Sequence, residues 1–303
     1  MNWYALAPLA IVLLVAPAVS GIVIKTKAVL TGRRGAPVMQ LYYDIGKQFR
    51  KRTIYSTTAT WVFRTGPVVA LVSVLIALVF VPLDGQNALV QFEGDMLAFA
   101  ALLALGRFAL VLAGLDTGSS FEGMGASREV TFASFAEPSL FLSFIGLSLA
   151  TGKLSLSGML GSSIGGAWQE AGASLVLLGF SLFILLLAEN SRVAVDDPAT
   201  QLELTMIHEV IVLDHSGPDF ALILYGASLK LALFAAVVVA VFVPRGSFGP
   251  AQAMVLLLVG LLLVAVMVGI VESAMARLRL TRVPQLLVRA GALALFAIIL
   301  LLR

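Results

Sequence analysis

The chain has 303 residues, of which 60% are hydrophobic and 12% are charged, with a net charge of +3 and a mean hydropathy of +1.02. A soluble domain carries about twice that charged fraction, so the composition indicates an integral membrane protein. The chain has no cysteine, which excludes a disulfide framework and an iron–sulfur or thiolate metal site held by this chain alone. We expect no nucleic-acid binding, because membrane topology explains the basic residues.

The N-terminal segment 1–21 has the apolar run and small residues of either a signal peptide or a first membrane helix. No positive charge precedes the run, and Lys25 and Lys27 follow it. This pattern favours a retained helix whose N-terminus lies outside the cell, with cleavage as the alternative.

Eight apolar segments along the chain are candidates to cross a bilayer, which takes about 20 residues. All but the fifth are long enough, and the fifth can borrow residues from its flanks. We therefore expect an all-α membrane protein that forms one polytopic domain over residues 1–303. The predicted spans lie near 4–24, 65–83, 96–115, 131–150, 172–189, 219–243, 251–272 and 285–302.

Basic residues set the predicted orientation. Most lysines and arginines fall in or beside the loops at 25–64, 116–130, 190–218 and 273–284. The positive-inside rule places these loops in the cytoplasm and both chain ends outside.

The cytoplasmic segment 189–219, with the sequence ENSRVAVDDPATQLELTMIHEVIVLDHSGPD, runs against this trend. It contains both histidines of the chain and one basic residue, Arg192. Because desolvated carboxylates are costly, a membrane protein that gathers titratable groups beside its helices usually uses them. The segment therefore points to proton-coupled or electron-coupled work. Its acids are Glu189, Asp196, Asp197, Glu203, Glu209, Asp214 and Asp219.

His208 and Glu209 resemble the start of a metalloprotease motif, but position 212 is Val where a second histidine ligand would stand. His208 and His215 with flanking carboxylates could bind a metal, although a hydrogen bond that orders the loop is the favoured interpretation. We predict no catalytic residue and no metal site.

Outside the acidic segment, four of the ionisable residues at or within predicted spans are candidates for proton transfer. Glu129 and Glu137 are eight residues apart, which on a helix gives about 12 Å of rise and about 80° of rotation. Arg107 and Lys230 each lie well inside their spans, where cations need carboxylate or carbonyl partners. The functional interpretation is a relay of coupled groups that carries a proton. The alternatives are a structural ion pair and, for Glu129, a pair with Arg128.

The first cytoplasmic loop is long and basic. Its segment QLYYDIGKQFRK, at 40–51, is predicted to be an amphipathic helix on the membrane or on a partner, with Leu41, Tyr42, Ile45 and Phe49 on one side.

Five motifs in order, RRG at 33–35, QLYYD at 40–44, IYSTTATWVFRTGP at 54–67, GMGASRE at 123–129 and the acidic segment 189–219, resemble the respiratory complex I subunit 1 family. The resemblance is closest to the branch found in formate hydrogenlyase and energy-converting nickel–iron hydrogenases. It implies a non-catalytic membrane anchor and ion-coupling subunit in a bacterial or archaeal cell (inner) membrane. It also implies antiporter-like membrane partners and peripheral partners of the iron–sulfur and hydrogenase-large-subunit types. Any iron–sulfur cluster, and a possible nickel–iron site, would belong to those partners, because this chain binds no cofactor.

The resemblance carries over Glu137 and Glu189 by motif. We expect them to form a proton pathway with Glu129, Arg107 and Lys230, which their positions at or within the spans indicate. Two departures weaken any claim of a quinone site: GAPVMQ follows RRG, and His215 replaces a tyrosine. The rival functions are a stand-alone secondary transporter and a purely structural anchor. Residues implied in docking and coupling are Arg33, Arg34, Asp44, Arg192, Asp196, Glu203, Glu209 and Asp214.

Overall fold

The computed structural model describes residues 3–192, 208–275 and 283–303, and this part of the chain contains helices and no strand. Eight of the helices are long and apolar enough to cross a membrane, which confirms the predicted all-α, multi-pass architecture. They are α1 (Trp3–Leu30), α3 (Trp61–Val79), α4 (Asp95–Asp116), α5 (Ser120–Thr151), α7 (Ile164–Glu189), α10 (Gly217–Phe242), α11 (Pro250–Ala274) and α12 (Val283–Leu301).

Three short helices complete the described chain. The helix α2 (Gln40–Phe49) forms where the amphipathic helix was expected, and it packs against α1 and α10. The other two are α6 (Leu156–Leu160) and α9 (His208–Ile211).

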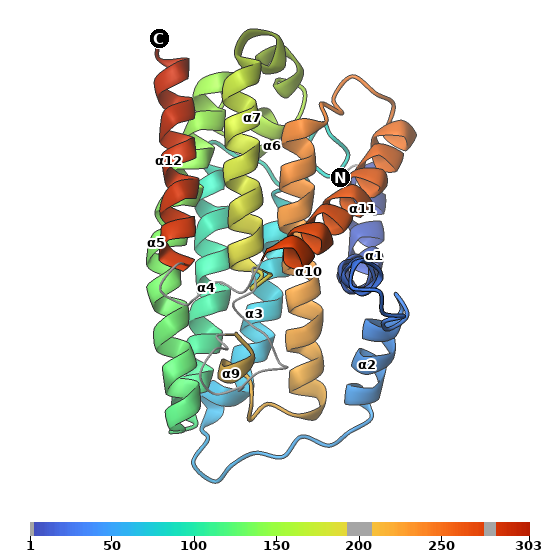
Figure 1. Ribbon diagram of the computed structural model, residues 1–303, viewed down its shortest axis with the longest axis vertical. Helices are drawn as coiled ribbons and strands as arrows, with labels where there is room; N and C mark the ends of the chain where they lie inside the picture. The colour runs from blue at the N-terminus through green and yellow to red at the C-terminus, as the bar shows by residue number, and fades with distance from the viewer. Residues whose placement is uncertain (1–2, 193–207, 276–282) are drawn as a thin grey trace.

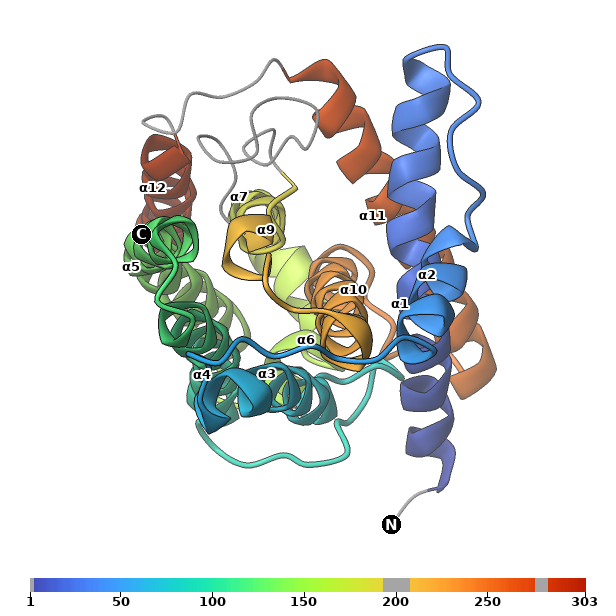
Figure 2. The same cartoon turned by 90° about the horizontal axis from the view of Figure 1, so that it is seen from below.

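The helices α7 and α10 lie at the centre of the bundle (Figures 1 and 2). The helices α3, α4, α5 and α12 form an arc on one side, and α1 and α11 lie on the other side (Figure 2). The helix α10 is the most enclosed span, with 72% of its apolar window buried, because it contacts α1, α3, α7 and α11. The short helix α9 lies inside this ring, at what we call the α9 end of the bundle (Figure 2).

The helix α5 corrects one predicted boundary. The segment 116–130 was expected to be a loop, but only residues 117–119 separate α4 from α5. The GMGASRE motif is helical, and its Gly125 and Ala126 are buried in the bundle. The small residues of this motif allow close packing, because α5 contacts both α4 and α9.

Serine hydroxyls join α12 to its neighbours. Ser139 of α5 donates to the carbonyl of Leu287 at 3.1 Å, and Ser181 of α7 donates to the carbonyl of Ala290 at 2.8 Å. Ser143 lies 3.0 Å from Ser181 and links the two donors. Such hydroxyl–carbonyl bonds hold apolar helices together where lipid provides no hydrophobic drive between them.

At the opposite end of the bundle, Arg245 is 1% exposed and donates to the carbonyl of Leu83 at 2.8 Å. This contact ties the α10–α11 connection to the α3–α4 connection. Burial disfavours the charged form and lowers the pKa of Arg245 to about 10.

Candidate functional site

Arg107, near the middle of α4, is the centre of one buried charge cluster. Its Nη2 donates to both carboxylate oxygens of Glu189, at 2.6 and 2.7 Å. Its Nη1 donates to Glu137 at 2.7 Å, and its Nε lies 3.5 Å from Glu129. The planar guanidinium thus joins three carboxylates from α5 and α7, a geometry that a single ammonium cannot match.

Lys230 of α10 completes the cluster from the other side. Its Nζ lies 2.8 Å from Glu189 Oε2 and donates to the main-chain carbonyl of Glu189 at 2.8 Å. The structure therefore brings together all five residues predicted to form the relay. They are Arg107, Glu129, Glu137, Glu189 and Lys230.

Glu189 reaches the cluster because α7 ends early, about halfway along α4 and α10 (Figure 1). The N–H of Ser191 donates to the carbonyl of Ala188 at 3.1 Å, and the N–H of Arg192 donates to that of Leu187 at 2.8 Å. This is the Schellman pattern, which requires a left-handed residue. Ser191 supplies it with φ 50°, the one positive φ outside glycine among the described residues.

Most of the cluster is buried, but one of its carboxylates reaches the surface of the chain. The side chains of Arg107 and Glu189 are 9% and 8% exposed, whereas that of Glu137 is 42% exposed. Glu137 faces a hollow between α4 and α5 that is lined by small residues, including Ala100, Ala101 and Ala104. The partly exposed carboxylate lies well within a membrane-spanning helix, where an uncovered charge is costly.

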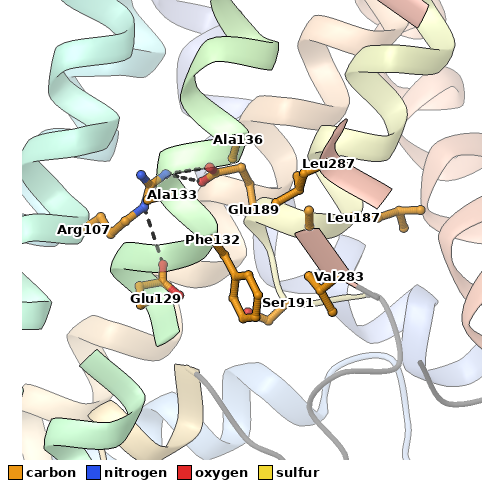
Figure 3. Close-up of a pocket in the computed structure, with 11 residues that line it drawn as sticks. Arg107, Glu129, Phe132, Ala133, Ala136, Leu187, Glu189, Ser191, Val283 and Leu287 are labelled. Carbon is orange, nitrogen blue, oxygen red and sulfur yellow. Dashed lines mark hydrogen bonds and ion pairs between the residues drawn. The ribbon is translucent and has the colours of Figure 1, made fainter. Parts of the chain in front are cut away.

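Two cavities reach the cluster from inside the chain. The first lies between α5, α7 and α12 and is lined by Arg107, Glu129 and Glu189 together with Val283 and Leu287 (Figure 3). The second, with an empty volume of about 580 Å³, lies between α3, α4 and α10. Its walls are mostly apolar, and its charged residues are Arg107, Glu129 and Lys230.

The strap, residues 52–60, crosses the α9 end and bonds to the start of α10 and to the end of α4. Tyr55 donates to Asp219 at 2.9 Å, and the N–H of Ile54 donates to the hydroxyl of Ser216. Thr60 donates through its N–H and its hydroxyl to Asp116. The strap therefore fixes the corner between α9 and α10, where the acidic segment returns to the membrane.

His215 lies in this corner, is 5% exposed and stacks on Phe63 with ring centroids 3.9 Å apart. Burial disfavours the imidazolium and lowers the pKa of His215 to about 4. Neither ring nitrogen has a hydrogen-bond partner among the described residues. The hydrogen bond expected to order the loop through the histidines is therefore wrong for the His215 side chain, which is held by ring stacking instead.

The residues predicted to dock a partner are spread out. Arg33 and Arg34 are exposed beyond α1, and Asp44 accepts a hydrogen bond from Gln40 within α2. Arg192 points its guanidinium at the hydroxyl of Ser20 on α1, at 3.5 Å. The structure does not bring these residues into one cluster.

The other docking residues lie in or beside the acidic segment. Asp214 is exposed and donates its N–H to Glu122. Asp196, Glu203 and the side chain of Glu209 lie outside the described residues. The described part of the chain contains no group of acidic residues or histidines placed to hold a metal ion.

Glu122, in the first turn of α5, is a buried carboxylate that the sequence reading missed. It was assigned to a loop because the start of α5 was placed at 131. Its spacing of seven residues from Glu129 was the available signal, since that spacing places both on one helix face.

Comparison with known proteins agrees with this architecture. The family model for NADH dehydrogenase (NADHdh) matches residues 4–302. Hydrogenase-4 component C of Escherichia coli (strain K12) is 33% identical over 286 residues, covering 90% of this chain and 87% of that protein. Formate hydrogenlyase subunit 4 of the same organism is 29% identical over 292 residues, covering 93% of each.

A solved structure shares the fold. A chain in the structure of the membrane-bound sulfane sulfur reductase, an archaeal respiratory membrane complex, superposes with a TM-score of 0.79 at 19% identity and covers 98% of both chains. The resemblance drawn from the five sequence motifs is confirmed by the family model and by the two Escherichia coli relatives. The chain belongs to the NADH dehydrogenase (complex I subunit 1) family.

Proposed function

We propose that this chain is the membrane anchor and ion-coupling subunit of a complex I-like or hydrogenase-like redox complex. It links a cytoplasmic iron–sulfur arm, whose cofactors belong to partner subunits, to the translocation of H⁺ or Na⁺ by antiporter-like membrane partners. The observation that carries the proposal is the charge cluster on Arg107, which joins α4, α5, α7 and α10 at the point where the acidic segment begins.

The charge balance of the cluster suits proton uptake. It contains three carboxylates and two cations, so it carries one excess negative charge when every group is ionised. One added proton removes that excess without leaving an uncompensated positive charge in the bilayer. Because Arg107 contacts all three carboxylates, the proposed proton is shared by the cluster and is not assigned to one residue.

Glu189 connects the cluster to the acidic segment. It is the last residue of α7, and the acidic segment continues from it through Ser191 and Arg192. A displacement of that segment by a docked partner would therefore act on the residue that both Arg107 and Lys230 hold. Coupling requires that the two redox states of the partner interact differently with this segment, since an equal interaction shifts no equilibrium.

Glu137 is the proposed exit toward a neighbouring membrane subunit. Its side chain is the most exposed of the cluster carboxylates, and it faces small residues of α4. A partner helix that packs against Ala101 and Ala104 would cover the charge and receive the proton.

The proposed orientation follows the basic residues, with both termini outside a bacterial or archaeal cell membrane and the α9 end in the cytoplasm. Arg33, Arg34 and Asp44, together with the acidic segment, then face the peripheral arm. Lipid surrounds the remaining outer faces of the spans.

Purification in mild detergent through a tag on the C-terminus tests the assignment. Mass spectrometry of the intact complex is expected to find an iron–sulfur protein, a hydrogenase-large-subunit-like protein and at least one antiporter-like protein. Recovery of the chain alone, with transport activity in liposomes, would instead support a stand-alone transporter.

A further inference from the structure

We propose that Glu122 is the proton-entry group at the α9 end of the chain, and that it passes protons along α5 to Glu129. This inference rests on the proposed ion-coupling function and adds a residue to its path. It starts from a buried carboxylate that the cluster on Arg107 does not include.

Glu122, Glu129 and Glu137 form a row along α5. The intervals of seven and eight residues correspond to about 10.5 and 12 Å of rise, with rotations of about 20° in one sense and about 80° in the other. Glu122 and Glu129 therefore share one face of the helix. The row leads from the α9 end to the hollow beside Glu137.

The two oxygens of Glu122 have different surroundings. The residue is 0% exposed, and its Oε1 accepts the N–H of Asp214 at 3.1 Å. Its Oε2 is buried and accepts no hydrogen bond from the described residues, because the nearby hydroxyl of Thr117 donates to the carbonyl of Gly114. The hydrogen bond to the N–H of Asp214 accounts for the burial of Oε1 only, and the amide oxygen of a glutamine could accept that bond equally well. The second buried oxygen is where a proton can be held.

The cavity between α3, α4 and α10 is lined by residues of the cluster and by Ile211, and Glu122 lies outside it. Gly114 of α4 lies between Ile211 and Glu122. A Cβ built at this glycine would lie 3.0 Å from Ile211 and 3.9 Å from the Cβ of Glu122. Ile211 in turn lines the cavity of about 580 Å³ that contains Glu129, Arg107 and Lys230. Ile211 and Gly114 thus separate Glu122 from one end of this cavity, whereas Glu129 lines the cavity directly.

The proposed step is a simple proton transfer. A proton from solvent at the α9 end binds the ionised carboxylate of Glu122. It then moves through bridging water molecules to the carboxylate of Glu129, and Glu122 becomes ionised again. No electron changes hands in this step. Water is required because about 10 Å of helix rise separates the two carboxyl groups.

The Glu122→Gln substitution separates proton transfer from corner capping. Glutamine retains an acceptor for the N–H of Asp214 but cannot exchange a proton at this site. The purified complex would be reconstituted into liposomes, and proton uptake would be measured with a pH-sensitive dye while the complex turns over with its own electron donor. We expect Glu122→Gln to lose proton uptake and to assemble normally, whereas the exposed control Glu93→Gln keeps both.

Glu129→Gln and Glu122→Ala make the outcomes distinguishable. If Glu122→Gln pumps normally while Glu129→Gln does not, the entry role is overturned and the proposed function stands. If both pump normally, the proposed function fails as well. If only Glu122→Ala loses pumping, Glu122 is a structural cap and the inference is wrong. Should Glu122→Gln fail to assemble, Glu122→Asp decides: the inference predicts retained uptake, and loss overturns it.

A second readout does not depend on pumping. Infrared difference spectra between the oxidised and reduced complex are expected to contain a carboxylic-acid band that is missing in Glu122→Gln and present in Glu93→Gln. An unchanged set of carboxyl bands in Glu122→Gln would contradict the transfer.

Discussion

Lys230 holds Glu189 at two points, because its ammonium lies 2.8 Å from the carboxylate and 2.8 Å from the main-chain carbonyl of the same residue. The carbonyl is one of the last in α7, where helical carbonyls have no partner within the helix. A cation at a helix C-terminus is also favoured by the helix dipole. One lysine therefore fixes both the charge of the cluster and the end of the helix from which the acidic segment departs.

Replacing Lys230 with Met should destabilise the protein, because Glu189 then loses one of its two cations. Breaking a buried ion pair on one side costs about 3–5 kcal/mol. Thermal unfolding of the purified protein in detergent measures the effect. Lys153→Met, which removes an exposed lysine, is the control and should leave the melting temperature unchanged. Lys230→Met combined with Glu189→Gln should recover part of the loss, and no recovery would show that the pair is not the source of the stability.

The Arg107→Lys substitution keeps the positive charge at the centre of the cluster but removes the planar guanidinium with its several donors. A single ammonium cannot contact Glu129, Glu137 and Glu189 together. We expect the complex to assemble and transfer electrons, with fewer ions moved per electron. The comparison is made in liposomes against Arg289→Lys, which alters an exposed arginine of α12. Equal ion-to-electron ratios in the two variants would mean that the cluster needs only a positive charge at position 107.

Ser191 tests the ending of α7. Its left-handed backbone costs a residue with a Cβ about 1–2 kcal/mol relative to glycine. Ser191→Gly should therefore preserve or raise the melting temperature, whereas Ser191→Val should lower it, because a β-branched residue disfavours this region further. A melting temperature of Ser191→Val equal to that of the parent protein would contradict the Schellman ending.

His215 makes the α9–α10 corner sensitive to acid. Burial lowers its pKa from 6.5 to about 4. Between pH 6.5 and pH 4, the unfolded corner binds more protons than the folded corner. The contribution of His215 to the free energy of unfolding is therefore fully present above pH 6.5 and is lost as the pH falls toward 4. At pH 5 the loss is on the order of 2 kcal/mol.

Hydrogen exchange of residues 208–217, corrected for intrinsic rates, measures this loss. Exchange should be faster at pH 5 than at pH 7 in the parent protein. His215→Phe keeps the stacking on Phe63 and should remove the difference. A pH effect that persists in His215→Phe would assign it to another group.

Much of this architecture could be predicted from the sequence. Eight spans follow from hydropathy, because all apolar segments but the fifth are long enough to cross a bilayer. The fifth, predicted at 172–189, borrows flanking residues and begins at Ile164. Arg107, Glu137 and Lys230 could be grouped because ionisable residues within spans need each other as partners. The family motifs added Glu189.

The arrangement of the cluster could not be predicted in the same way. Glu189 was expected at the mouth of a loop, and its contact with mid-helix residues depends on the early ending of α7 through Ser191, a non-glycine residue in a glycine conformation. Hydropathy starts the fourth span at 131 and therefore leaves Glu122 in a loop, whereas α5 begins at Ser120 and packs against α4 and α9. Such packing against distant segments is not visible in local sequence.

The most direct test of the central claim is the number of protons moved per electron in liposomes that contain the complex with Glu137→Gln. This substitution keeps the size of the side chain but removes the proposed exit carboxylate. We predict that assembly and electron transfer are retained while coupled proton movement is lost. Proton movement at the parent ratio would contradict the account and would leave the chain as a structural anchor.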